Sequence, residues 1–282
     1  MESITTDALT LVIPSYRNHR YLELCLRSAV TFKRNPTTTI IVVIDGYPEE
    51  SQTVIDMFPE VQSIILPENK GMQYALNMGV MHAETSLVMI ANDDNVFSVA
   101  WDILAIEEFR LATLNAYRLV LSINQIEPTG PSIFDFPIVD CGQTVDTFNM
   151  TQWVDTEQTH RSSLQTYTGA IFPFVILKRY YMAVGGFDTF YDSPNWCDVD
   201  FFLKLELLDF TFIRTHAFSL YHFGSVSTKR NIDAPSFRQK ELVAAQVFEY
   251  KWGFRTPILA NTRHGNSKLP HSEGRAAIRG LG

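Results

Sequence analysis

The stretch VQSIILPENKGMQYALNMGVMHAETSLVMIANDDN (61–95) decides the fold, because it indicates one complete strand–helix–strand unit. Its two runs of aliphatic and β-branched residues, 61–66 and 86–91, are typical of buried strands. Between them, apolar or small residues recur at helical spacing, at Met72, Ala75, Leu76, Gly79 and Val80. Two strands joined by a helix predict a parallel sheet with that helix on one of its faces.

The residues before this stretch repeat the pattern twice. Strands are predicted at 9–13 and 39–44, and a helix is predicted after each of them, around Leu22 and from Pro48. Asn18 is expected to cap the first of these helices. The chain is therefore predicted to be an α/β protein with a doubly wound, mostly parallel central sheet and helices on both faces. Ligands of such sheets bind at the carboxyl ends of the strands.

The pattern is less regular beyond Trp101, where a long polar stretch, 124–167, is expected to hold short elements and to cover a site. Residues 256–282 carry few large apolar side chains, which predicts a mobile tail. The other elements expected are helices over 99–114, 178–184, 236–252 and from about Asp198, and strands over 118–123, 169–177, 211–214 and 217–221.

Composition limits the function classes. A formal net charge of −8 argues against a nucleic-acid binder that relies on a basic surface. The three cysteines are widely spaced and form no CxxC pair, which is typical of reduced thiols in a cytoplasmic protein. No apolar stretch approaches the ~20 residues of a transmembrane segment. We therefore expect a cytoplasmic location, with peripheral contact to a membrane left open.

Polar side chains follow each predicted strand of the first hundred residues, and they would meet at one edge of the sheet. They are Ser15-Tyr16-Arg17-Asn18, Asp45-Gly46, Asn69-Lys70-Gly71 and Asp93-Asp94-Asn95. Because neither GxGxxG nor GxxxxGK[ST] is present, this edge does not match the usual dinucleotide or P-loop sites. The adjacent carboxylates of Asp93 and Asp94 would both stay ionised beside Mg²⁺ or Mn²⁺, which prefer oxygen ligands. Alternatively, these residues only cap a turn or helix.

Eight motifs in order resemble the family 2 glycosyltransferases of the GT-A fold, over about residues 9 to 254. They are VIPSYRN, VIDG, ENKGMQYALNMG, ANDDN, VGGFD, CDVDFFLKL, HFGSVS and KWG. The most specific is N-x-G-x-x-x-A-x-N-x-G, which begins at Asn69. The resemblance implies a nucleotide-sugar-binding half over 1–100 and an acceptor-binding half over 101–255, within one domain.

The resemblance also implies a site for a nucleotide-diphosphate sugar, with UDP as the favoured nucleotide. The implied binding residues are Pro14, Ser15, Tyr16, Asp45, Asn69, Lys70 and Asp93. Asp93 and Asp94 stand where the family places its metal motif, which implies Mn²⁺ or Mg²⁺ as cofactor. Which of the two carboxylates binds the ion and which meets the ribose stays open. His222 resembles a late family histidine that completes the metal site or contacts the diphosphate, although a lone histidine is also a common structural hydrogen bonder.

The resemblance assigns the catalytic base to Asp198, within Cys197-Asp198-Val199-Asp200. Residues two apart on a helix point in different directions, so Asp198 and Asp200 cannot both face one acceptor. Without the resemblance, both would be interpreted as complements of the positive helix N-terminus.

The function that follows is a metal-dependent, inverting glycosyltransferase that moves a hexosyl or deoxyhexosyl group to a hydroxyl of a glycan or glycoconjugate. Two other readings remain open. A nucleotidyltransferase would share the sheet and the metal, but it would need a glycine-rich loop after the first strand. A catalytically silent nucleotide-sugar or glycan-binding module stays possible because Cys197 replaces a glutamate common in the family.

Overall fold

The computed structural model describes residues 7–130, 136–166, 171–192, 194–224 and 234–253. Its strands are β1 (Leu9–Ser15), β2 (Thr39–Asp45), β3 (Val61–Leu66), β4 (Leu87–Ile90), β5 (Asn95–Val96), β6 (Leu119–Ile126), β7 (Gln165–Thr166), β8 (Phe174–Leu177) and β9 (Thr211–His222). Its helices are α1 (His19–Phe32), α2 (Pro48–Ile55), α3 (Met72–His82), α4 (Trp101–Thr113), α5 (Met150–His160), α6 (Lys178–Ala183), α7 (Pro194–Glu206) and α9 (Ala234–Trp252).

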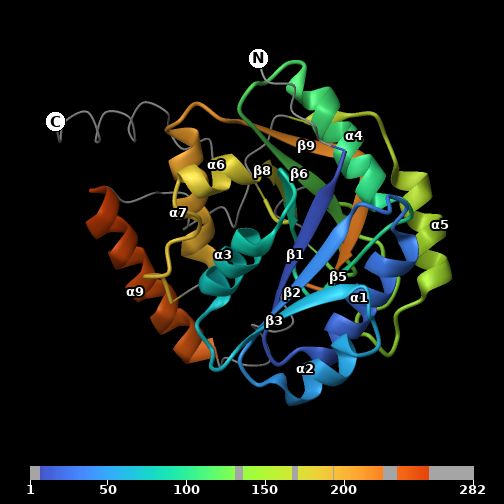
Figure 1. Cartoon of the computed structure of the whole chain (residues 1–282), viewed down its shortest axis with the longest axis horizontal. Coiled ribbons are helices and arrows are strands. Elements are labelled where there is room, and N and C mark those ends of the chain that lie inside the picture. Colours follow the sequence, from blue (N-terminus) through green and yellow to red (C-terminus); the bar gives the residue numbers. More distant parts are fainter. Residues whose placement is uncertain (1–6, 131–135, 167–170, 193, 225–233, 254–282) are drawn as a thin grey trace.

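All the strands join in one sheet, in the order β3-β2-β1-β4-β8-β6-β9-β5, with β7 paired to β9 (Figure 1). The neighbours from β3 to β4 are parallel, as predicted from the repeated strand–helix pattern. Beyond β4 the sheet is mixed, because β8 runs antiparallel to both β4 and β6 while β6 and β9 are parallel. The division into two halves at residue 100 stays a prediction, and β4 and β8 join those halves within one sheet.

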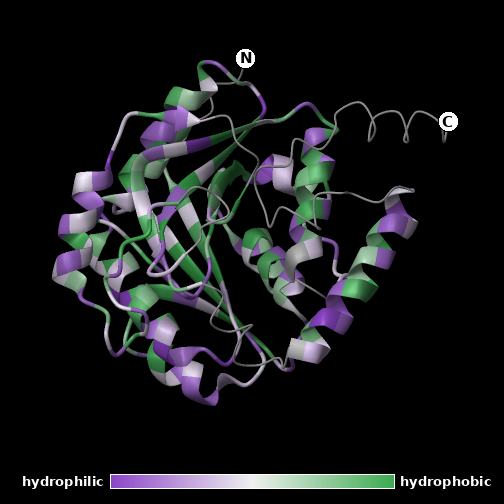
Figure 2. Cartoon of the chain, turned by 180° about the vertical axis from the view of Figure 1, so that it is seen from behind, coloured by the Kyte–Doolittle hydropathy of each residue, from purple (hydrophilic) through white to green (hydrophobic). Residues whose placement is uncertain are grey.

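Helices cover both faces of the sheet, which confirms the predicted layers. The core on one face is formed with α1, α2 and α4, and the core on the other face with α3, α6, α7 and α9. Alternate residues of one strand contribute to the two cores: Leu11 and Ile13 face α1, whereas Val12 faces α3. Figure 2 shows the result, with largely hydrophobic central strands under helices that alternate in colour.

Gly79 brings α3 unusually close to the sheet. A Cβ atom at this position would lie 2.4 Å from Cγ1 of Val12 and 3.1 Å from Cγ2 of Val43. Only a residue without a side chain fits against these two strands, which explains the last glycine of the Asn69–Gly79 motif. The close packing holds the carboxyl half of α3 against β1 and β2.

The structure corrects several predicted boundaries. α7 begins at Pro194, before Asp198, and the two strands expected within 211–221 form one long strand, β9. The polar stretch contains α5, whose Trp153 is fully buried in a cluster with β9. Asn18 precedes α1 but makes no side-chain cap, because its amide donates to Asp93 instead.

Within the part of the chain that the structure describes, no helix is long and apolar enough to cross a membrane. The predicted mobile tail, 256–282, lies outside the described residues.

Candidate functional site

Asp93 lies buried at the carboxyl end of β4, next to the end of the parallel strand β1. Its two carboxylate oxygens accept hydrogen bonds from Ser15 Oγ at 2.7 Å and from Asn18 Nδ2 at 2.9 Å. Burial raises the pKa of Asp93 to about 7, and the neighbouring charge of Asp94 adds to this, while the two hydrogen bonds oppose it. Asp93 therefore ties the ends of two strands together.

Asp94 points to a different partner, His222 at the end of β9. β5 pairs with β9 so that Asn95 lies opposite His222, which brings Asp94 Oδ1 to 3.6 Å from His222 Nε2. Two ligands of one divalent ion, each about 2.1 Å from it at an angle of about 90–120°, lie about 3.0–3.6 Å apart. The pair therefore fits a shared ion.

Among the residues described, no group of three His, Cys, Asp or Glu side chains is arranged to hold a metal. A site with only two protein ligands suits Mg²⁺ or Mn²⁺, which keep waters and bind phosphate oxygens of a substrate. The structure thus brings Asp94 and His222 together, whereas both oxygens of Asp93 are already hydrogen-bonded.

Asp45, at the end of β2, holds the loop between β3 and α3. Its buried carboxylate accepts hydrogen bonds from the backbone N–H groups of Lys70 at 2.6 Å and Gly71 at 2.9 Å. Burial raises the pKa of Asp45, and these two hydrogen bonds oppose that rise. Asn69 Oδ1 also accepts from the N–H of Gly71, whose φ of 92° favours glycine. The Lys70 ammonium is exposed and pairs with Glu68.

Two aromatic side chains and a cation meet where β1 and β2 end. Pro14 is buried within β1, while Tyr16 is partly exposed and lies edge-on to Tyr47, with ring centroids 5.9 Å apart. The guanidinium of Arg17 lies 3.5 Å from the centre of the Tyr47 ring. The φ angles of Arg17 and Tyr47, 49° and 54°, are uncommon for residues with side chains. In the sequence, the only functional signal for Arg17 and Tyr47 is their place after a strand.

Asp198 lies in the first half of α7 and is partly exposed. Burial is the largest effect that raises the pKa of its carboxyl well above the ordinary range, and Glu241 of α9 adds repulsion. The Cys197 thiol lies 3.5 Å from Asp198 Oδ1 and opposes the rise. A carboxylate with a raised pKa is a stronger base than an ordinary aspartate.

The amino end of α7 lies beside the amino end of α3. Gln73 Nε2 donates to the carbonyl oxygen of Tyr191 at 3.0 Å, just before α7 begins. Since α3 follows β3, this contact brings the beginning of α7 to the edge of the sheet where the parallel strands end. Cys197, the neighbour of Asp198, also contacts Gln73, which places the first turns of α7 beside the amino end of α3.

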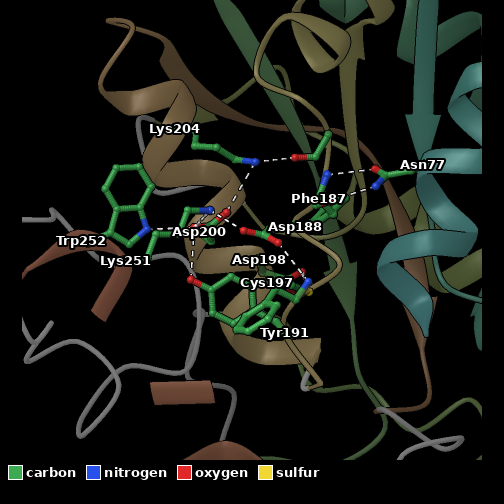
Figure 3. Close-up of polar contacts among 12 residues, drawn as sticks. Asn77, Phe187, Asp188, Tyr191, Cys197, Asp198, Asp200, Lys204, Lys251 and Trp252 are labelled. Atoms are coloured by element: carbon green, nitrogen blue, oxygen red, sulfur yellow. Dashed lines mark hydrogen bonds and ion pairs between the residues drawn. The ribbon is translucent and has the colours of Figure 1, made fainter. Parts of the chain in front are cut away.

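Asp200 is fully buried and faces away from Asp198, as expected for residues two apart on a helix (Figure 3). Four donors surround its carboxylate: the Tyr191 hydroxyl at 3.2 Å, Trp252 Nε1 at 2.8 Å, Lys251 Nζ at 2.8 Å and Lys204 Nζ at 3.5 Å. Lys251 also pairs with Asp188 at 2.6 Å. Asp200 thus joins α7, the preceding segment and the end of α9.

Asn77, also in the Asn69–Gly79 motif, holds the turn after α6 (Figure 3). Its side chain accepts from the N–H of Phe187 at 2.9 Å and donates to the carbonyl oxygen of Phe187 at 2.8 Å. A Cβ atom on Gly186 would lie 2.3 Å from Asn77 Oδ1, and φ there is +64°. The asparagine and the second glycine of VGGFD therefore form one structural contact.

Residues 10–112 match the family model described as Glycosyl transferase family 2. This stretch, just over a third of the chain, is therefore similar to family 2 glycosyltransferases. The chain is similar to the glycosyltransferase GlyA of Streptococcus pneumoniae serotype 4, with 30% identity over 95 residues. Those residues are 33% of this chain and only 14% of the length of GlyA.

Solved structures share the fold of most of the chain. TarS 1–349 of S. aureus in complex with UDP matches 88% of this chain and 72% of its own, with a TM-score of 0.52 and 14% identity. GalNAc-T7 with UDP, GalNAc and Mn²⁺ matches 76% of this chain and 43% of its own, with a TM-score of 0.56 and 12% identity. The chain therefore has the GT-A fold predicted from its motifs.

Proposed function

We propose that this chain transfers a sugar from a nucleoside-diphosphate donor to a hydroxyl group of a glycan or glycoconjugate, with inversion at the anomeric carbon. The observation that carries the proposal is the pair formed by Asp94 and His222, which lie 3.6 Å apart at the carboxyl edge of the sheet in a GT-A fold. The family 2 match over 10–112 supports a glycosyl rather than a nucleotidyl transfer.

Asp198 is the proposed base. Its carboxylate accepts the proton of the acceptor hydroxyl while that oxygen bonds to the anomeric carbon of the donor. The bond between this carbon and the diphosphate oxygen breaks, and its electron pair leaves with the nucleoside diphosphate. Burial raises the pKa of Asp198, which makes its carboxylate a stronger proton acceptor.

Asp94 and His222 would hold Mg²⁺ or Mn²⁺, which would stabilise the negative charge that develops on the leaving diphosphate. The nucleotide would lie against Pro14, Ser15 and Tyr16. The remaining residues proposed to bind it are Asp45, Asn69, Lys70 and Asp93. UDP is the proposed nucleotide, and UDP in the TarS and GalNAc-T7 structures is consistent with that choice.

Replacement of the base tests the assignment of Asp198. Asp198→Asn removes the proton acceptor and should lower the transfer rate about 10²–10⁴-fold. Asp192→Asn is a matched control, because Asp192 precedes the same helix, is exposed and pairs only with Lys240 among the ion pairs described. Product formation measured by mass spectrometry, with circular dichroism as a check of folding, should separate the two variants. A folded Asp198→Asn variant with normal transfer would overturn the assignment.

Donor hydrolysis separates the proposed enzyme from a silent binding module. With UDP-, GDP- and dTDP-sugars as a panel, we expect slow release of the nucleoside diphosphate from one donor class. EDTA should abolish the release, because it removes the cation that would stabilise the negative charge of the leaving diphosphate. Added Mn²⁺ or Mg²⁺ should restore the release. Full release in EDTA would remove the ion from the proposal, whereas binding without release or transfer would favour the module.

A further inference from the structure

Glu127 lies on the opposite side of His222 from Asp94. Its Oε1 is 3.0 Å from His222 Nδ1, while His222 Nε2 is 3.6 Å from Asp94 Oδ1. The imidazole thus lies between two carboxylates, and each ring nitrogen faces a different one. Nothing in the sequence around Glu127 distinguished it.

The pairing of three strands produces this arrangement. β9 lies between β6 and β5, where Ile126 pairs with Tyr221 and Asn95 pairs with His222. The register of β6 and β9 shifts along the pair, because Ile123 pairs with Thr215 but Asn124 pairs with Ser219. Residues 216–218 are therefore left out of this pairing. Without the shift, the residue after Ile126 would lie beside Ser219 instead of His222.

Glu127 is fixed by its backbone as well as by its side chain. Its N–H donates to the carbonyl oxygen of Pro137 at 3.1 Å, and its carbonyl accepts from the N–H of Val139 at 2.9 Å. Only 20% of its side chain and 13% of the His222 side chain are exposed. Two mostly buried groups held from both sides make a defined contact rather than a mobile surface pair.

The distances to Glu127 and Asp94 indicate that Nδ1 of His222 donates a hydrogen bond while Nε2 is placed to bind an ion. A neutral imidazole carries one N–H, and 3.0 Å is a hydrogen-bond distance to a carboxylate oxygen. At 3.6 Å, Nε2 is too far from Asp94 for a hydrogen bond but lies where a second ligand of one ion would be. A carboxylate that accepts from the distal N–H of a metal-binding histidine fixes the tautomer and the orientation of the ring.

We propose that Glu127 is a positioning residue that accepts the Nδ1–H of His222 and thereby presents Nε2, with Asp94, to a divalent cation. This inference rests on the proposed function, because it assumes that Asp94 and His222 bind the ion.

Direct measurement of Mn²⁺ affinity tests the inference without any turnover. Free Mn²⁺ is followed by electron paramagnetic resonance in the presence of UDP, for the full chain and its variants. Glu127→Ala should weaken Mn²⁺ binding about 10–100-fold. Glu127→Gln should lose less Mn²⁺ affinity, since an amide oxygen still accepts from Nδ1–H.

Glu108→Ala is the control and should bind Mn²⁺ normally. Glu108 also accepts hydrogen bonds, from Thr215 at 2.6 Å and Gln165 at 2.9 Å, but these contacts lie away from His222.

A second measurement on the unmodified chain covers the case in which Glu127→Ala does not fold. With Mg²⁺ and UDP added, ¹⁵N NMR of the histidine ring should show His222 protonated at Nδ1 and not at Nε2. The opposite tautomer would overturn the inference, as would normal Mn²⁺ affinity in a folded Glu127→Ala variant. If the unmodified chain binds no Mn²⁺, the result contradicts the proposed metal site itself, and with it the role of Glu127.

Discussion

Asp93 and Asp94 are neighbours in sequence, yet their carboxylates have different surroundings and would have different roles. Asp93 is enclosed by Ser15 and Asn18, and its pKa is raised to about 7 mainly by burial. Asp94 faces His222 across 3.6 Å. We therefore expect Asp94 to bind the ion directly, while Asp93 fixes the strand end on which Asp94 is carried.

The raised pKa of Asp93 predicts a pH dependence of stability. The ordinary value is 3.8 and the folded value is about 7, so the folded state favours the neutral carboxyl. The resulting stabilisation is complete below about pH 4 and is lost as the pH rises through 7. Its upper limit is about 4 kcal/mol, since each pKa unit corresponds to about 1.4 kcal/mol.

Asp93→Asn should remove this dependence, because the amide does not titrate. Urea unfolding of both proteins in EDTA between pH 4 and 8 is the measurement. The free energy of unfolding of the unmodified chain should fall relative to that of the variant as the pH rises. Parallel pH profiles for the two proteins would contradict the raised pKa.

At the scale of the element, α7 presents one carboxylate on each of two sides. Asp198 lies near the beginning of α3, whereas Asp200 is buried against the last turn of α9 by Lys251 and Trp252. The contact with α9 fixes the rotation of α7 about its axis, and this rotation determines where Asp198 points. The end of α9 therefore helps to position the proposed base, and Glu241 of the same helix acts on Asp198 directly.

Removal of the lysine at the end of α9 tests that contact. Lys251→Ala leaves the buried carboxylate of Asp200 with fewer donors and should lower the free energy of unfolding by about 1–3 kcal/mol. Lys240→Ala on the same helix breaks only an exposed pair with Asp192 and should cost about 0–1 kcal/mol. Urea unfolding of the two variants gives the comparison, and equal losses would show that Asp200 does not depend on Lys251.

At the scale of the whole molecule, local patterns predicted the elements but not the contacts between distant segments. The helical spacing around Gly79 and the runs before Asp45 and Asp93 predicted the parallel half of the sheet. Glu127 was missed because its role depends on a register shift between two strands, which no local pattern encodes. The start of α7 was also misplaced. Its buried side is set by tertiary packing on α3 and α9 rather than by a regular apolar repeat.

During synthesis, β4 is made long before β8, the strand that pairs with its second edge. β1 to β4 all lie within residues 9–90, but β8, which covers the outer edge of β4, begins at Phe174. Until a ribosome has made those later residues, the edge of β4 is open to pairing with another chain. A fragment that stops at residue 112, where the family match ends, would carry the same open edge permanently. The segment that matches the family model thus ends before the strand that pairs with the second edge of β4.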